Sequence, residues 1–451
     1  MMRFQRLASA LLSSLMLVAA SGCDETDGPA GPGNDGGPDS PGGGDHTWYS
    51  DVGPLLVEKC GACHQDGSIA PFTIDYDAAY PWRASIKAEV EARTMPPMTV
   101  NNDGSCQTFS NARWLTDAEI KMIGDWVDAG APEGEVAELP AFPEDLVLDD
   151  PDLEIETPEY EANDAIDDDY RCFPVVMAGG ADKFLTEYEV VPGNKAIAHH
   201  MILYLIDSAD AALTASTDAA SPDVPGYPCF GAATPDGGTG QERPLILWAP
   251  GSGRSKMPEG TGIRIPAGST VVMQMHYNLA NGGGTDQTKI KMMLADDGDV
   301  EEAIFFPLAN TTMSVASGEE YVEALPGAGF ENGRLAIPDL PVDVPITIHG
   351  VFPHMHKMGR TLRVDFTSNE GGDQCLVDVD RWDFNWQEGW WYDEPIEFPK
   401  SGTGREFTIT CGFDTRSSNM PEVSWGEGSD DEMCLNYLYI TSPFLAQIGN
   451  F

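Results

Sequence analysis

Residues 195–205 read KAIAHHMILYL, an apolar run that carries two adjacent histidines, His199 and His200, in its middle. The run predicts a buried β-strand. Consecutive residues of a regular strand point to opposite faces of a sheet, so one partner could not easily receive both imidazoles. The stretch therefore holds either two unrelated histidines or one site on a strand that ends, bulges or twists at the pair.

The chain around and after this run has the pattern of an all-β protein. Short apolar runs such as STVVMQMHYNL, ITIHGVF, TLRVDF, CLVDV and REFTITCGF are separated by Gly, Pro and Asp. Such spacing is typical of antiparallel β-sandwiches, and about 300 residues of it exceed one sandwich. We therefore expect two jelly-roll-like sandwich domains, over residues 159–298 and 299–451, joined near ADDGDVEE (295–302).

Composition limits the class of partner. The 451 residues suffice for about three domains, and they include 73 acidic against 25 basic side chains, a formal charge of −48. This charge argues against nucleic acid and anionic lipid headgroups as partners. It suits an exported or salt-tolerant protein.

The first 23 residues, MMRFQRLASALLSSLMLVAASGC, resemble an export signal. They combine a basic start, a short apolar core and small residues before Cys23. The ending ASGC resembles a bacterial lipobox, which would make Cys23 a lipidated residue; the alternative is an ordinary cleaved signal with a chance cysteine. Residues 24–46, rich in Gly, Pro and Asp, predict a disordered tether. We expect an exported protein, in the periplasm or at the cell surface, attached to the membrane by its lipid alone.

Residues 47–135 carry helical signals and the motif CGACH. In C-x-x-C-H the two thiols can each add to a haem vinyl group while the histidine binds the iron, which assigns covalent attachment to Cys60 and Cys63 and an axial position to His64. A zinc or redox pair is the alternative, but no further zinc ligands cluster nearby. In the helix predicted over TDAEIKMIGDWVDAG, Thr116 and Glu119 form a capping box.

The stretch RTMPPM offers a second axial ligand in Met95 or Met98. The segment resembles small bacterial cytochrome c domains, in which a methionine before proline after a helix is the ligand, so we choose Met95. The expected domain is a small all-α, cytochrome c-like unit with one haem c. Residues 136–158, acidic and proline-rich, predict a linker.

Histidines are few, so their positions are informative. Six of the eight fall in the predicted β region: His199, His200, His276, His349, His354 and His356. A single histidine in a strand is more often a packing residue than a ligand. The H-H and H-x-H pairs, however, bring imidazoles within reach of one ion, and imidazole suits copper or zinc.

Five motifs in order, AHHMILY, QMHYN, HMHKMG with its H-x-H-x-x-G spacing, and DEMC followed by LNYLY, resemble those of the ascorbate-dependent copper monooxygenases. The resemblance covers roughly residues 150–451. It implies two sandwiches with one copper each, facing one another across a solvent-filled cleft. His199, His200 and His276 would bind the electron-relay copper. His354, His356 and Met433 would bind the copper that meets O2, and Tyr437 would lie near it or simply pack in its strand.

The ligand chemistry agrees with this assignment. Three imidazoles serve both copper oxidation states, and a thioether favours Cu(I). For the adjacent pair we expect one ring to bind through Nδ1 and the other through Nε2. A zinc hydrolase is the competing metalloenzyme, but an H-E-x-x-H motif is missing from the sequence. His349 has no counterpart in the family motifs, and we expect it to be structural.

The same resemblance bears on the cysteines and on the substrate. It favours disulfides between Cys411 and Cys434 and between Cys172 and Cys229, which leaves Cys106 and Cys375 as a possible third pair. Peptide-amidating members carry an arginine two residues before H-x-H, where this chain has Phe352. This departure makes a peptidylglycine substrate doubtful and slightly favours an apolar or aromatic one.

The sequence thus favours a monooxygenase that hydroxylates a small substrate with O2. Its electrons would come from the fused haem, in place of or beside ascorbate, and ultimately from an external donor. One alternative is a non-catalytic electron-transfer or copper-binding lipoprotein. Another is an adhesion or carbohydrate-binding module joined to an independent cytochrome.

Overall fold

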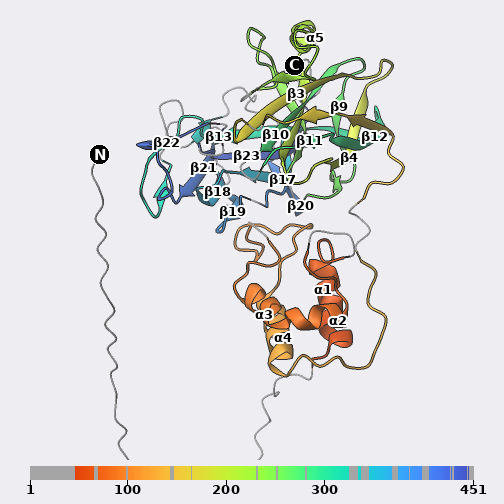
Figure 1. The fold of residues 1–451 in the computed structure, drawn as a ribbon, viewed down its shortest axis with the longest axis vertical. Coiled ribbons are helices and arrows are strands. Elements are labelled where there is room, and N and C mark those ends of the chain that lie inside the picture. Colours follow the sequence, from red (N-terminus) through yellow and green to blue (C-terminus); the bar gives the residue numbers. More distant parts are fainter. Residues whose placement is uncertain are drawn as a thin grey trace, which may run out of the picture. The chain divides into compact units, whose positions relative to one another are not determined.

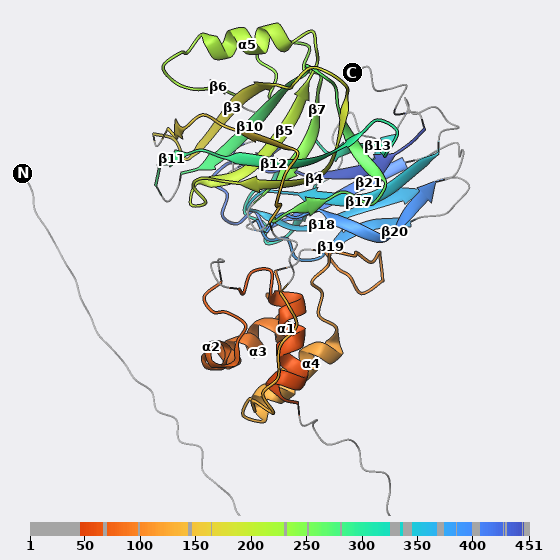
Figure 2. The same cartoon turned by 90° about the vertical axis from the view of Figure 1, so that its right-hand side faces the viewer.

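A computed structural model describes most of residues 46–445 (Figures 1 and 2). The ranges outside the description are 1–45, 66–69, 98–99, 143–146, 164, 230–231, 250–251, 280–281, 325–333, 337–344, 368–373, 385, 399–405, 427, 429–430, 444 and 446–451. The signal, Cys23 and nearly all of the tether therefore lie outside the described residues. In the part that is described, β-strands predominate over helix.

The N-terminal described segment is helical. It contains a π-helical turn η1 (Trp48–Val52), α1 (Gly53–Cys60), α2 (Tyr76–Ala79), a 3-10 turn η2 (Tyr80–Trp82), α3 (Arg83–Glu91) and α4 (Asp117–Asp128). The predicted capping box begins α4, and Gly130 follows the helix end with a φ of 90°. Trp48 and Trp126 are fully buried in the core of this segment. The helices are short, and they do not by themselves establish a cytochrome c-like fold.

One stretch expected inside the helical domain belongs partly to the β region. We call residues 100–115 the strap. Val100 and Phe109 are buried in the C-terminal β core and form single bridges to Val379 and Tyr392, whereas Leu115 is buried in the helical core. The strap, which falls inside the predicted haem domain 47–135, thus contributes to both the helical and the β core, and the predicted boundary stays a prediction.

The N-terminal sandwich places the histidine pair in a five-stranded sheet. In order its strands are β6 (Tyr227–Pro228), β3 (Asp168–Val176), β10 (Thr270–Asn278), β5 (Ala198–Ile206) and β7 (Glu242–Trp248). Apolar residues of this sheet pack in one core with those of β4 (Lys183–Val191), β9 (Thr261–Ile265) and β12 (Lys289–Asp296). The helix α5 (Ala211–Ala219) lies outside the sheet, near β3 (Figure 2).

A nine-stranded sheet runs through both sandwiches. Its N-terminal part contains β1 (Leu153–Glu156), β12 (Lys289–Asp296), β4 (Lys183–Val191), β8 (Ser255–Lys256) and β9 (Thr261–Ile265). It continues through β13 (Glu301–Ala309), β23 (Leu435–Thr441), β17 (Ile346–His354) and β20 (Trp390–Phe398). The parallel pairing of β9 with β13 joins the two parts. The junction expected near residues 295–302 falls between β12 and β13, which belong to this one sheet.

The second layer of the C-terminal sandwich is another sheet. It contains β15 (Val322–Glu323), β21 (Glu406–Phe413), β18 (Gly359–Thr367) and β19 (Gln374–Val379), with β16 (Arg334–Ala336) also paired to β21. Two small ribbons complete the strands: β2 (Tyr160–Glu161) with β11 (Thr285–Asp286), and β14 (Ser314–Ala316) with β22 (Glu422–Ser424). The predicted linker 136–158 already contains β1, so the β region begins earlier than expected.

Three disulfides cross-link the described residues. They join Cys411 to Cys434, Cys172 to Cys229 and Cys106 to Cys375. These are the two pairs that the family resemblance favoured and the third that the sequence left open. Disulfides persist in oxidising compartments, so they indicate an exported protein. None of the described helices is long and apolar enough to cross a bilayer.

Candidate metal centre

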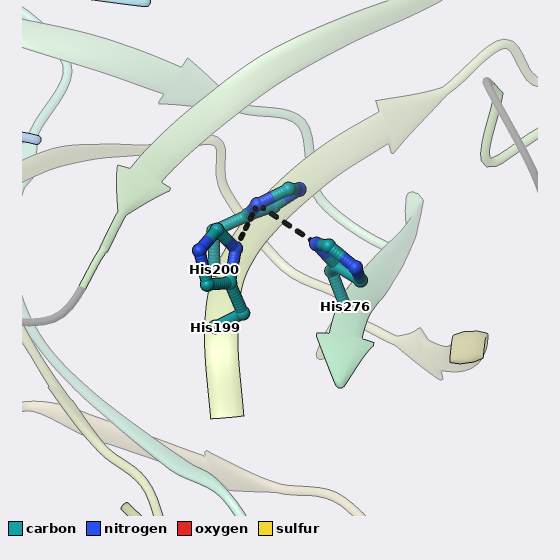
Figure 3. Close-up of side chains that lie close together, drawn as sticks. All are labelled: His199, His200 and His276. Atoms are coloured by element: carbon teal, nitrogen blue, oxygen red, sulfur yellow. Dashed lines mark hydrogen bonds between the residues drawn. The ribbon is translucent and has the colours of Figure 1, made fainter. Parts of the chain in front are cut away.

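The histidine pair of β5 lies at an interruption in the pairing of that strand. His276 of β10 is opposite His200, but the next residue of β10, Tyr277, is opposite Ala198. His199 is therefore the extra residue of a bulge, which turns its side chain away from the regular alternation. The irregularity predicted from the sequence is present, and the three imidazoles gather at it (Figure 3).

The three rings face one another through the same type of atom. His200 Nδ1 lies 3.2 Å from His199 Nδ1 and 3.3 Å from His276 Nδ1. One potential ligand atom from each residue falls within 4.8 Å of the others. Nδ1 of both adjacent histidines faces the cluster, so the predicted combination of one Nδ1 and one Nε2 is not found. The bulge explains the difference, since it brings both rings to the cluster on the same side.

A carboxylate orients the third histidine. His276 Nε2 donates to Asp168 Oδ1 at 2.8 Å, which leaves Nδ1 without the proton and aimed at the other rings. The ring of Tyr170 stacks on His276 with a centroid distance of 4.1 Å and an interplanar angle of 8°. Partners of this kind fix the tautomer and orientation of metal-binding histidines. Asp168 was not singled out in the sequence, because its place opposite His276 depends on strand pairing.

The surroundings keep these imidazoles neutral. Burial lowers the pKa of His199 to about 3, with a further lowering by His276. Burial also takes the pKa of His200 well below its usual value, and it lowers the pKa of His276 although Asp168 acts in the opposite direction. Neutral imidazole is the form that binds metals.

A second pair of imidazoles lies at the end of β17. The rings of His354 and His356 have centroids 5.3 Å apart and are nearly perpendicular, at 89°. His354 Nδ1 donates to Gln387 Oε1 at 2.6 Å, and His356 Nδ1 donates to the carbonyl oxygen of Asp431 at 3.1 Å. With Nδ1 engaged in both rings, Nε2 is the nitrogen that a metal would use.

A buried carboxylate links this pair to Met433. Glu432 Oε2 accepts from the backbone N–H of His356 at 3.0 Å and of Met433 at 3.3 Å, while Oε1 accepts from Met358 N–H at 2.5 Å. Met433 is 5% exposed, and its neighbour Cys434 is cross-linked to Cys411. Burial raises the pKa of Glu432 to about 7. Glu432 therefore contacts the backbone of two predicted ligands, His356 and Met433. The sequence did not indicate this role.

The two imidazole clusters lie side by side. The ring centroids of His200 and His354 are 6.0 Å apart. Phe384 stacks on His199 at 4.5 Å and lies 6.4 Å from the ring of His356. The solvent-filled cleft that the resemblance implied is therefore not present between these residues, because aromatic packing and direct ring contacts bring the clusters together.

The C-x-x-C-H motif lies where α1 ends. Cys60 is the last residue of α1, and the backbone N–H groups of Cys63 and His64 both donate to its carbonyl oxygen. Neither cysteine is in a disulfide. His64 Nδ1 donates to the carbonyl oxygen of Phe72 at 3.1 Å, which leaves Nε2 for a ligand.

Met95, the expected second axial ligand, follows α3 and is 41% exposed. It lines a pocket together with Val90, Arg113 and Leu115. Met98, the other candidate, lies outside the described residues. The assignment of Met95 as the partner of His64 stays a prediction.

Three further residues from the sequence analysis lie in the β core. His349 Nε2 is 3.0 Å from Thr441 Oγ1, a contact that accounts for it as a structural residue. Tyr437 is opposite Phe352 in the β17–β23 pairing and packs at the edge of the N-terminal core. Phe352 is buried against the ring of Phe305, at 4.9 Å. Because Phe352 fills the core, its identity gives no indication of the substrate.

The chain was also compared with known proteins. Residues 336–445 match the family model described as copper type II ascorbate-dependent monooxygenase, C-terminal domain. The C-terminal sandwich thus resembles a copper monooxygenase domain. The match includes His354, His356 and Met433. The description of that family names copper, ascorbate and a monooxygenase activity.

Two other comparisons add little. A search of curated proteins gives no match. Among solved structures, PNGase F, a glycosylasparaginase from Flavobacterium meningosepticum, aligns with 64% of this chain and 96% of its own, at 9% identity and a TM-score of 0.24. At that TM-score the likeness carries no argument about this chain.

Proposed function

We propose that this protein is a copper-dependent monooxygenase that hydroxylates a C–H bond of a small substrate. The observation that carries the proposal is the meeting of two imidazole clusters, with His200 and His354 centroids 6.0 Å apart, in a chain whose residues 336–445 match a copper monooxygenase domain. The finer assignments below rest on the donor chemistry of each cluster.

The first cluster fits a copper ion. His200 Nδ1 lies 3.2 Å from His199 Nδ1 and 3.3 Å from His276 Nδ1. Lone pairs that face one another at these distances repel unless a proton or a cation lies between them. Burial lowers the pKa of His199 and of His276 and so keeps these rings neutral. The proton of a neutral tautomer can then lie between only two of the Nδ1 atoms, whereas one metal ion would engage all three. Three neutral imidazoles suit copper in both of its oxidation states.

The second cluster fits a copper ion of different character. It offers Nε2 of His354 and His356, and Met433 is attached to the same carboxylate as His356. Two imidazoles with a thioether favour Cu(I). When copper is bound, the two centres supply the redox chemistry that places one oxygen atom of O2 in the substrate and reduces the other to water.

The protein residues around the clusters hold the ligands in place. Asp168 holds the proton on His276 Nε2 and so keeps Nδ1 as the ligating atom. Gln387 holds the proton on His354 Nδ1 and so keeps Nε2 as the ligating atom. The ring of Phe384 stacks on His199 and so limits the orientations open to that imidazole.

The helical segment fits a covalently attached c-type haem. Cys60 and Cys63 are unpaired thiols at one helix end, and His64 has Nε2 available beside them, with Met95 as the expected second axial ligand. Held by these residues, a haem would supply one-electron storage between an external donor, such as ascorbate, and the two imidazole clusters. Lipidation at Cys23 would anchor the exported protein to a bacterial membrane.

The alternative is a non-catalytic electron-transfer or copper-binding lipoprotein. Oxygen uptake separates the two. The copper-loaded full-length protein, given ascorbate and a panel of small apolar and aromatic compounds, should consume O2 and form a hydroxylated product, and Met433→Leu should abolish both. A protein that binds copper and haem but consumes no O2 above the metal-free control contradicts the enzyme and favours the alternative.

A further inference from the structure

One loop of the C-terminal sandwich contacts both imidazole clusters. We call residues 382–389, between β19 and β20, the connecting loop; Asn385 lies outside the described residues. Phe384 stacks on His199 with centroids 4.5 Å apart and an interplanar angle of 26°. Gln387 Oε1 accepts from His354 Nδ1 at 2.6 Å. Both clusters therefore share one short stretch of chain.

The end of the connecting loop contacts the strap. Arg113 donates to Glu388 through both guanidinium nitrogens, at 2.6 Å to Oε2 and 3.2 Å to Oε1. Both side chains are largely buried, at 19% and 22% exposure. A two-point Arg–carboxylate contact fixes direction as well as distance.

Arg113 also reaches the helical segment. It lines one pocket with Val90 of α3 and with Met95, the expected second axial ligand. The Arg113–Glu388 pair is therefore the point at which the connecting loop meets the segment that would hold the haem.

Further contacts of the strap hold the Arg113–Glu388 ion pair in place. Asn111 Nδ2 donates to the carbonyl oxygen of Gly389 at 2.8 Å, and Asn111 Oδ1 accepts from Trp391 N–H at 3.0 Å. The disulfide between Cys106 and Cys375 fastens the same strap to β19. A covalent cross-link and side-chain hydrogen bonds on each side of the ion pair indicate a rigid connection.

We propose that the connecting loop is the route of electron transfer between the C-x-x-C-H segment and the imidazole clusters, entered at Arg113–Glu388 and left through Gln387 and Phe384. The inference rests on the proposed function, since it requires haem and copper at the sites assigned above. Glu388 and Gln387 are consecutive, so one peptide unit and two polar contacts connect Arg113 with His354. One electron moves and no atom does: ferrous iron is oxidised as cupric copper is reduced.

The test uses the full-length protein with haem and copper in place. Ferrous haem is mixed without O2 and its reoxidation is followed by absorbance in wild type and in Glu388→Gln. We expect slower reoxidation in the variant, because the loop loses its charge-assisted two-point contact with Arg113. The matched control is Glu187→Gln, which breaks the Arg254–Glu187 pair of the N-terminal sandwich and should react as wild type does.

A second readout needs neither metal nor haem. In the metal-free protein, Glu388→Gln should speed backbone hydrogen exchange at residues 386–391, because the pair no longer fastens the loop. The charge-swapped double variant, Arg113→Glu with Glu388→Arg, should recover both protection and rate. The recovery would indicate the contact itself rather than either residue alone.

The outcomes separate two failures. If Glu388→Gln and Arg113→Met both reoxidise their haem at the wild-type rate, with unchanged copper and iron content, the route is overturned and the proposed function stands. Wild-type protein that holds both metals but keeps its haem reduced overturns the relay of the proposed function, and the route with it.

Discussion

The Nδ1 atoms of His200 and His276 lie 3.3 Å apart across the pairing of β5 with β10. These two residues are direct partners in that pairing, whereas His199 reaches them only through the bulge, because a regular ladder would leave His199 on the other face of the sheet. Local backbone irregularity therefore converts a sequence doublet into a three-nitrogen cluster.

Asp168→Asn should weaken metal binding at the three-histidine cluster. The asparagine amide is neutral, so it accepts a weaker hydrogen bond from His276 Nε2, and the ligating tautomer is less favoured. Loss of such a supporting contact typically costs about 10–100-fold in metal affinity. Copper titration followed by electron paramagnetic resonance measures the effect. The exposed neighbour Asp167→Asn is the control, and equal affinities in both variants would contradict this role.

Met433→Leu should affect the second cluster alone. Leucine has nearly the volume of methionine, so the fold should lose less than about 1.5 kcal/mol. Without the thioether, the affinity for Cu(I) should fall by about tenfold or more, whereas Cu(II) at the three-histidine cluster stays bound. Competition with a Cu(I) chelator reports the change. Met420→Leu, at a side chain 60% exposed, is the matched control and should bind as wild type does.

His349 should contribute a defined part of the acid sensitivity of the metal-free protein. Burial lowers its pKa to about 4, below the value of about 6.5 expected in the unfolded chain. Its contribution to stability is therefore complete above about pH 6.5 and is lost as the pH falls towards about 4. The difference in unfolding free energy between wild type and His349→Gln should shrink between about pH 7 and about pH 4.5. Urea titrations measure this difference, and a constant gap would refute the explanation.

The cross-link between Cys106 and Cys375 should stabilise more than the one between Cys172 and Cys229. The first joins residues 269 apart in sequence and the second joins residues 57 apart. Because the entropy of loop closure grows with loop length, replacing the first pair by serine should cost about 1 kcal/mol more than replacing the second. Denaturant unfolding of the two double variants decides. An equal or smaller loss for the first pair would mean that the strap is held by its packing alone.

Some of the site was predictable because its information is local. The doublet at His199 and His200 requires a strand irregularity on steric grounds alone, and the structure has it. The order of the motifs indicated which distant histidine, His276, joins the pair. The favoured cysteine pairs were likewise found as disulfides.

Other features depend on pairing between distant segments, which periodicity does not reveal. Asp168 reaches His276 only because β3 lies beside β10, and Gln387 reaches His354 only through the fold of the connecting loop. The strap has no regular pattern of its own and gains its place from β19 and β20. Glu432 was the easiest of these residues to find from the sequence, because it directly precedes Met433 in DEMC. A buried acid next to a predicted ligand is a signal that could have found it.

Metal analysis of the purified, copper-reconstituted full-length protein, after dialysis to remove loosely bound ions, tests the central claim most directly. Two copper sites and one haem predict a copper-to-iron ratio of about two, falling to about one in the His200→Ala variant. Iron without copper, or zinc in place of copper at an unchanged ratio in the variant, would contradict the account.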